Sequence, residues 1–284
     1  MNTKRKNIIV RVSIGIFIFA FFIINSLSPI RTNLPGLGSV AIASDQKDAS
    51  DIALDIDKMA KTDHVSLLKY CIDNYNKQYS HYTCTFLKQE TIRGKLGKEQ
   101  TTTIKFMEKP FSVVMTWTEN RPSPADRVIF VDGKYNNKIL CRPVGLLGLA
   151  GTQIRDPLSE EAKASSINPI TEFGITKMTQ NLIGVYELAK KNGDLTEEFG
   201  GYFTLDGRKC IMIVRHIKEN SSQNYPANKT ETYIDLEYLV PVCVKGWNWK
   251  NKLSCTYHYK NLKFDTDLTE IDFSTQKNDM KPVN

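Results

Sequence analysis

The sequence predicts an α+β protein in which a large curved antiparallel sheet packs against helices. Apolar residues recur every three or four positions in two segments, as they do along one face of a helix. Elsewhere apolar and polar residues alternate, with many β-branched and aromatic side chains, which indicates half-buried strands. The links between these strands are too short for crossover helices, so we expect neighbouring strands to pair antiparallel. The order of helix, strands, helix and strands favours the α+β class.

Both predicted helices have a recognisable start. Asp63 can cap the first helix, whereas Asn168-Pro169 precedes the second, which Gly193 ends. Each helix carries one apolar face, and that face must dock on the rest of the protein. The apolar positions are Val65, Leu68, Cys71, Ile72, Tyr75 and Tyr79 in the first helix, and Ile175, Met178, Leu182, Val185 and Ala189 in the second.

The predicted strands form two meanders, one before and one after the second helix. Asp132-Gly133 and Asp206-Gly207 have the composition of hairpin turns. The strands are expected at residues 82–86, 101–107, 111–117, 128–131, 138–141, 201–205, 209–217, 230–236, 240–249 and 252–264.

The six cysteines leave two alternatives open. An exported chain meets an oxidising compartment, but each cysteine stands alone in an apolar or strand-like segment, so disulfides and buried free thiols are equally expected. One pairing is disfavoured. A turn at Lys250-Asn251 makes Val244 face Tyr257, and it puts Cys243 and Cys255 on opposite faces of the hairpin.

Residues 1–43 have the three-part layout of a cleavable secretory signal. A basic start is followed by an apolar run over 12–27 and by the small-residue site Ala41-Ile42-Ala43. We therefore expect export to the periplasm or an equivalent extracytoplasmic compartment. The alternative is an uncleaved inner-membrane anchor, because the apolar run approaches the roughly 20 residues that span a bilayer. The N-terminus would then be the point of membrane contact.

The remainder divides into a tether, a domain and a tail. Residues 44–61 are polar and acidic and are predicted to form a tether, or the frayed start of a helix. A single α+β domain is expected over 62–275, and the polar residues 276–284 are predicted to be disordered. Within the domain, residues 145–151 are apolar and glycine-rich. They favour a hydrophobic flap or partner-contact loop over a phosphate-binding loop, because no Lys-Ser or Lys-Thr pair follows.

The net charge does not indicate nucleic-acid binding. The whole chain carries a formal charge of +7. Five of its 38 basic residues and none of its 31 acidic residues lie in 1–43, so the rest of the chain carries only +2. The remaining lysines and arginines are interspersed with acids, whereas nucleic-acid binding requires a basic stripe.

No pattern in the sequence indicates catalysis. The four histidines lack the spacing of a zinc site, and no G-x-S-x-G motif is present. Several carboxylates fall at expected strand ends or turns, where solvated charges are common; they are Glu90, Glu99, Glu108, Asp132 and Asp235. We therefore expect no enzyme activity, no metal and no cofactor.

The aromatic residues are the most useful guide to a ligand. Most belong to the predicted core, but a curved sheet covered by helices can leave a concave apolar cavity, where small apolar ligands bind. An apolar flap beside such a cavity would be consistent with this arrangement. The candidate lining residues are Phe86, Val113, Met115, Trp117, Leu146, Leu147 and Tyr257.

Four motifs are informative when they are taken together. They are Tyr82-Thr83-Cys84-Thr85-Phe86-Leu87-Lys88-Gln89-Glu90, Lys109-Pro110-Phe111-Ser112-Val113 leading to Trp117, Asp156-Pro157, and Asn168-Pro169-Ile170-Thr171-Glu172-Phe173-Gly174. In combination they resemble an exported bacterial family, domain of unknown function 1571, and the resemblance covers roughly residues 65–275. The later pattern of Tyr233-Ile234-Asp235, Leu239-Val240-Pro241-Val242 and Asp272-Phe273 is similar to the periplasmic lipoprotein-carrier superfamily, the Lol carriers. That similarity implies a half-barrel sheet with helices over its concave face, where acyl chains are held.

Three functional hypotheses follow. The first is an extracytoplasmic binding protein that shelters a lipid, an acyl chain or another apolar group, including the acyl group of an acylated protein, in an envelope-related role. The second is an envelope scaffold with a filled core and a protein partner. The third, ranked below both, is a hydrolase of envelope polymers or lipids. The flap distinguishes the first two, because it should border an empty cavity in a carrier and pack into the core of a scaffold.

Overall fold

The computed structural model describes residues 49–121, 124–264 and 266–283, all within one unit that spans 47–284. The predicted signal lies outside the described residues. Two helices come first, α1 (Ala49–Thr62) and α2 (His64–Gln78). Between them Asp63 caps α2, because its Oδ1 accepts from the Ser66 amide at 3.0 Å. Residues 49–61 are thus helical rather than a tether, since α1 buries Ile56 and Ala60 in an apolar cluster shared with α2.

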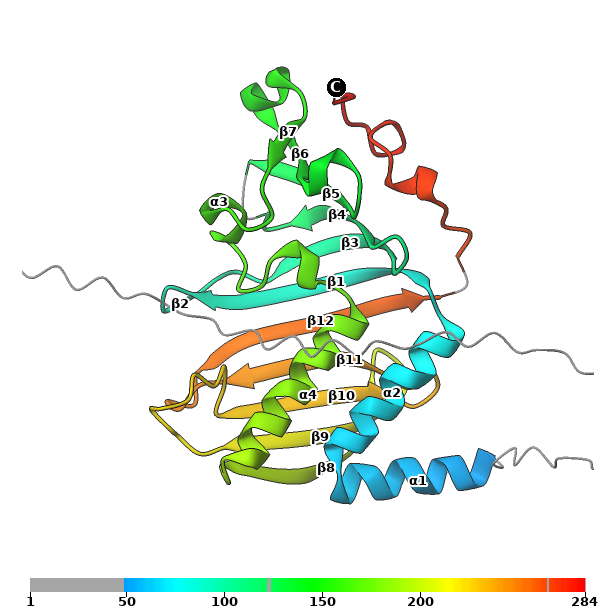
Figure 1. Ribbon diagram of the computed structural model, residues 1–284, viewed down its shortest axis with the longest axis vertical. Coiled ribbons are helices and arrows are strands. Elements are labelled where there is room, and N and C mark those ends of the chain that lie inside the picture. The colour runs from blue at the N-terminus through cyan, green and yellow to red at the C-terminus, as the bar shows by residue number, and fades with distance from the viewer. Residues whose placement is uncertain (1–48, 122–123, 265, 284) are drawn as a thin grey trace, which may run out of the picture. The chain divides into compact units, whose positions relative to one another are not determined.

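The sheet is antiparallel throughout, and its order is β7-β6-β5-β4-β3-β1-β12-β11-β10-β9-β8, with β2 paired to β1 (Figure 1). The predicted fold class, a large antiparallel sheet packed against helices, is confirmed. The first strands are β1 (His81–Ile92), β2 (Lys95–Leu96), β3 (Gln100–Met107), β4 (Ser112–Glu119), β5 (Ala125–Val131), β6 (Ile139–Pro143) and β7 (Gln153–Arg155). The later strands are β8 (Leu195–Leu205), β9 (Arg208–Ile217), β10 (Lys229–Asp235), β11 (Val240–Trp247) and β12 (Leu253–Lys263).

The strand register follows the alternation of the sequence. Tyr82 pairs with Phe106, and Val244 pairs with Tyr257 as predicted. Cys243 pairs with His258 instead of Cys255, and all six cysteines are free thiols. We call the face of the sheet toward the helices the inner face, and the opposite face the outer face.

Helices cover only part of the inner face. The helix α4 (Ile175–Lys191) lies with α2 across β8–β11, and both contact β11 (Figure 1). The inner face of β1 and β3–β6 is covered differently, by the chain that links β7 to α4. That link contains the short helix α3 (Glu160–Lys163) and the 3-10 helix η3 (Ile170–Glu172). The remaining 3-10 helices are η1 (Tyr135–Asn137), η2 (Gly145–Ala150), η4 (Glu270–Phe273) and η5 (Gln276–Asn278).

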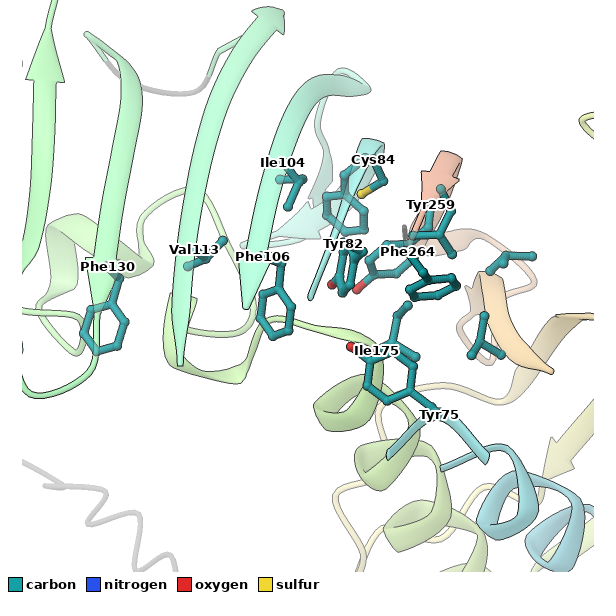
Figure 2. Packing of buried hydrophobic residues seen from close by; sticks show 14 of the residues in the cluster. Tyr75, Tyr82, Cys84, Ile104, Phe106, Val113, Phe130, Ile175, Tyr259 and Phe264 are labelled. Carbon is teal, nitrogen blue, oxygen red and sulfur yellow. The ribbon is translucent and has the colours of Figure 1, made fainter. Parts of the chain in front are cut away.

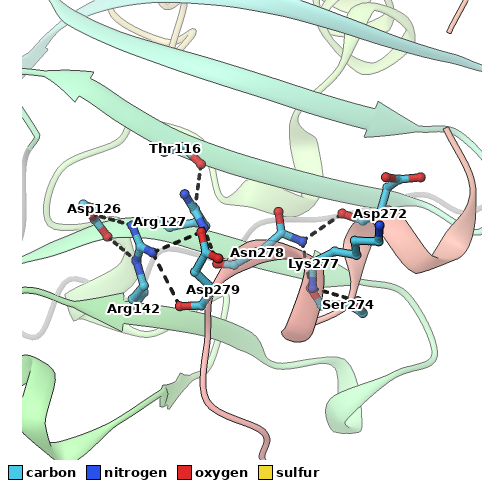
Figure 3. A network of polar contacts seen from close by, with 9 residues as sticks. All are labelled: Thr116, Asp126, Arg127, Arg142, Asp272, Ser274, Lys277, Asn278 and Asp279. Atoms are coloured by element: carbon cyan, nitrogen blue, oxygen red, sulfur yellow. Dashed lines mark hydrogen bonds and ion pairs between the residues drawn. The ribbon is translucent and has the colours of Figure 1, made fainter. Parts of the chain in front are cut away.

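The C-terminal segment lies on the outer face of β4–β6, whereas the sequence predicted a disordered tail. Met280 is 5% exposed and packs in a cluster with Phe273 from η4. Polar contacts fix the same segment (Figure 3). Asn278 donates from Nδ2 to the carbonyl oxygens of Asp272 and Ser274, both at 2.8 Å, and Arg127 binds the Asn278 carbonyl. The prediction of a disordered tail was wrong because it rested on the polar composition of 276–284, in which Met280 supplies the buried contact.

Candidate functional site

Aromatic rings from β1, β3 and the end of β12 form a cluster on the inner face (Figure 2). Tyr82 stacks on Phe106 with 4.8 Å between ring centroids, and Phe86 lies 4.8 Å from Tyr259. We call this group, together with Phe264, the aromatic cluster. Because strand side chains alternate, these rings share one face and leave polar residues such as Thr83 on the other.

Residues 156–174, which we call the covering segment, close this part of the inner face. Phe173 inserts into the aromatic cluster, with its ring centroid 5.2 Å from that of Phe86 and 5.9 Å from that of Phe106. Ala162 and Ile170 pack against the apolar core that contains these rings. The covering segment has only short helical turns, so side-chain insertion rather than a long helix holds it in place.

Gly174 joins the covering segment to α4. Its φ is +114°, a conformation that L side chains rarely adopt, and a Cβ there would stand 2.8 Å from Cζ of Phe106. Only glycine lets the backbone pass this close to the ring. The Phe173-Gly174 pair of the sequence motif therefore has a structural purpose, since it seats the covering segment on the aromatic cluster.

A buried polar group ties the covering segment to β1 and β12. Glu90 is 5% exposed, and its Oε1 accepts from Tyr257 Oη at 2.6 Å. Its Oε2 accepts from the Ile167 amide at 3.2 Å and lies 3.3 Å from Lys88 Nζ. Lys88 also donates to the Ser165 carbonyl at 3.1 Å. The prediction that Glu90 is a solvated strand-end charge was therefore wrong, because the covering segment buries it.

Burial also changes the pKa values of the two side chains that contact Glu90, which are Lys88 and Tyr257. Desolvation lowers the pKa of Lys88, although Glu90 acts in the opposite direction. Desolvation, Cys255 and Glu90 raise the pKa of Tyr257, so its hydroxyl keeps its proton and remains a donor. The Tyr257 hydroxyl therefore remains a hydrogen-bond donor to Glu90 in this tie between the strands and the covering segment.

A cavity of about 400 Å³ opens where β1 ends, beside this tie. Its wall combines the turn after β1, the start of β3, the end of β4 and the covering segment. The lining residues are Glu90, Ile92, Lys95, Gly97, Lys98, Gln100, Asn120, Arg121 and Ser165. A second cavity, of about 340 Å³, lies over Thr83, Thr85 and Thr103 on the outer face.

The structure brings together four of the seven predicted lining residues in one apolar cluster. Phe86 and Val113 are buried in the apolar core around the aromatic cluster, and Met115 and Tyr257 are half-buried against it. A fifth residue, Trp117, is half-buried and does not line the cavity itself, but its Nε1 donates to Oε1 of the lining residue Gln100 at 2.9 Å.

The other two residues lie apart, in η2. Leu146 is 88% exposed and Leu147 is 58% exposed, and neither lines either of the two cavities. The flap thus neither borders the cavity nor packs into the core. The covering segment takes the position that the sequence predicted for the flap.

One group of side chains has the residue types of a catalytic set. On the outer face Cys243 pairs with His258, whose Nε2 lies 2.7 Å from Asp206 Oδ2, as in a nucleophile, base and acid set. However, Cys243 is 1% exposed, and burial raises the pKa of its thiol to about 12, so the reactive thiolate is suppressed.

Within the described ranges, no three His, Cys, Asp or Glu side chains are placed to hold a metal ion. No helix in those ranges is long and apolar enough to span a membrane.

Residues 79–281 match the family model described as Protein of unknown function (DUF1571). The chain belongs to this family. The part of the chain that matches DUF1571 includes the covering segment, both sheet meanders and most of the outer-face C-terminal segment. No curated protein matches the sequence.

Solved structures resemble this DUF1571 protein at low identity. The MucA/MucB complex of Pseudomonas aeruginosa matches with a TM-score of 0.45 and 13% identity, over 75% of this chain and 61% of that chain. This DUF1571 protein therefore spans about three fifths of the length of the chain it matches there. The lipoprotein LppX of Mycobacterium tuberculosis matches with a TM-score of 0.42 and 11% identity, over 72% of this chain and 97% of that chain. An uncharacterised conserved protein of Thermus thermophilus matches with a TM-score of 0.41 and 10% identity, over 72% of this chain and 91% of that chain.

Proposed function

We propose that the chain is an extracytoplasmic binding protein that shelters a lipid, an acyl chain or another apolar group on the inner face of β1 and β3–β5. The observation that carries the proposal is the nature of the cover. The aromatic cluster is closed by an irregular segment that inserts one ring, Phe173, instead of a packed helix. An apolar group that displaced Phe173 would meet the same rings.

The binding energy would come from burial alone. Each methylene removed from water contributes roughly 0.8 kcal/mol, so a long acyl chain can be held without a strong polar anchor. Movement of the covering segment would expose Phe86, Val113, Met115 and Tyr257 of the inner-face core, and Trp117 follows Met115 on the same face of β4. No catalytic step is part of this proposal. The layout of residues 1–43 supports export, with the signal either cleaved or kept as an anchor.

A second candidate, an envelope scaffold, is favoured by two observations. Ala162, Ile170 and Phe173 of the covering segment pack against the apolar core of the inner face, as in a protein that binds no internal ligand. In addition, η2 exposes a small apolar surface made of Leu146, Leu147 and Leu149. Such a surface is typical of a contact with a protein partner.

Native mass spectrometry of residues 44–284, exported and gently purified, tests the first candidate. We expect extra mass that organic extraction removes. Met115→Asp, which puts a charge on the inner face, should abolish the extra mass. Thr103→Asp, at an exposed outer-face position of β3, should retain it. A clean apo mass for the unchanged protein, with no uptake of added lipids, would contradict ligand binding and favour the scaffold.

A further inference from the structure

We propose that the cavity at the end of β1 binds an anionic group, a phosphate or a carboxylate, at the polar end of an amphiphilic ligand. The inference rests on the proposed function for the apolar part of that ligand. The anion site itself is argued from the cavity alone.

The cavity has an excess of cations. Lys95, Lys98 and Arg121 line it from three different turns or strands, and all three are exposed. In the part of the chain that the structure describes, no carboxylate lies within ion-pair distance of any of them. These side chains therefore have donors to offer to a bound anion.

Glu90, the only carboxylate among the described residues of the lining, is already compensated. It pairs with Lys88 and accepts hydrogen bonds from Tyr257 and Ile167. The carboxylates of Glu99 and Glu119 belong to the neighbouring strands β3 and β4 or their flanking turns, but both are exposed and neither lines the cavity. The cavity therefore attracts anions despite the presence of Glu90.

One neutral side chain in the lining, Gln100, also has donors to offer. The Oε1 atom of Gln100 accepts from Trp117 Nε1, which leaves the Nε2 donors of Gln100 free to face an anion. This contact also joins the cavity to the inner face, because Trp117 and Met115 follow each other along the inner face of β4. A ligand with its anionic end in the cavity can therefore extend its apolar part along β4.

Backbone amide NMR of residues 44–284 tests the anion site, with the signals of Gly97 and Ser165 as reporters. The probes are inorganic phosphate, dihexanoyl phosphatidic acid and zwitterionic dihexanoyl phosphatidylcholine, all at low ionic strength. We expect both anionic probes to shift both signals, and phosphatidylcholine to bind at least about tenfold more weakly than phosphatidic acid. Tighter binding of phosphatidic acid than of phosphate would identify a lipid headgroup, whereas equal binding would identify a free anion.

The double variant Lys98→Glu/Arg121→Glu should weaken binding of phosphatidic acid by about tenfold or more. Lys77→Glu/Lys209→Glu changes the net charge equally at exposed positions outside the cavity, and it should bind as the unchanged protein does. Absence of shifts with both anionic probes, or equal weakening in both variants, would overturn the anion site. Fluorescence of the neutral dye N-phenyl-1-naphthylamine reports on the apolar site separately, so either proposal can fail alone.

Discussion

Tyr257 on β12 donates a hydrogen bond of 2.6 Å to Glu90 on β1, across the pair of strands at the middle of the sheet. Because Glu90 also accepts from the Ile167 amide, this one carboxylate joins two strands and the covering segment. Movement of the covering segment must therefore break contacts to a buried charge. The proposed binding of an apolar group depends on how much stability these contacts supply.

Tyr257→Phe should loosen the covering segment without unfolding the sheet. The change removes one donor from a buried carboxylate, which typically costs about 1–3 kcal/mol. Hydrogen exchange measured by mass spectrometry should speed up at residues 165–168. Tyr70→Phe, a half-buried ring on α2, serves as the control and should leave exchange there unchanged. Unaltered exchange in Tyr257→Phe would show that the tie does not hold the segment.

The pair of Lys88 and Glu90 should show strong coupling in a double-mutant cycle. Glu90→Gln alone leaves a buried ammonium without its partner, a loss that typically costs about 3–5 kcal/mol. Lys88→Met with Glu90→Gln removes both charges, so the double variant should be more stable than Glu90→Gln alone. Urea unfolding of the four proteins measures the coupling energy. Additive single effects would mean that the two charges do not interact.

Gly174→Ala should destabilise the protein, whereas Gly184→Ala should not. At Gly174 the positive φ and the approach of Phe106 both oppose a methyl group, and we expect a loss of about 1–3 kcal/mol. Gly184 is in α4, where a Cβ would meet nothing within 4 Å, so alanine should add up to about 1 kcal/mol. Thermal unfolding compares the two. Phe106→Leu in the Gly174→Ala background should recover part of the loss.

His64 should make the protein less stable as the pH falls from about 6.5 to 4. The ring is fully buried, its Nε2 donates to the Ala60 carbonyl, and its Nδ1 accepts from Tyr186 Oη, both at 3.0 Å. Burial lowers its pKa to about 4, against an ordinary value of 6.5. The unfolded chain therefore binds a proton over this window that the folded protein does not, which removes up to about 3 kcal/mol of stability.

His64→Gln removes this titration, although Glu197 remains, 3.7 Å from the ring in the unchanged protein. Urea unfolding at several pH values between 4 and 7.5 should give a shallower dependence of stability on pH for the variant. Parallel pH profiles for the two proteins would contradict the assignment to His64.

The sequence predicted the fold well because periodicity reports burial directly. The alternation around Tyr82, Cys84 and Phe86 placed three inward residues on β1, and the turn at 250–251 set the register of β11 and β12. The sequence left both a tether and a frayed helix start open for α1, because charged residues are spread along its length and only Ile56 and Ala60 are buried among its described side chains. The second helix was predicted to start after Pro169, but Phe173 and Gly174 hold the chain in an irregular path until Ile175.

The candidate site was predictable only in part. Aromatic residues of the strands could be assigned to one face from their spacing. The burial of Glu90 could not be predicted, because it depends on Tyr257 and on a loop 77 residues away from Glu90 in the chain. The exposure of Leu147 could not be predicted either, because apolar composition does not distinguish a flap over the inner face from a turn outside that face.

The pairing of β1 with β12 has a consequence for how the protein assembles. Each meander is built from strands close in the chain, but Phe86 must find Tyr259 across more than half of the sequence. Distant pairings of this kind form slowly, so we expect the two meanders to form first and this seam to close afterwards. The aromatic cluster takes rings from both sides of the seam. The full set of rings, on which we propose that an apolar group binds, is therefore assembled only when this seam has closed.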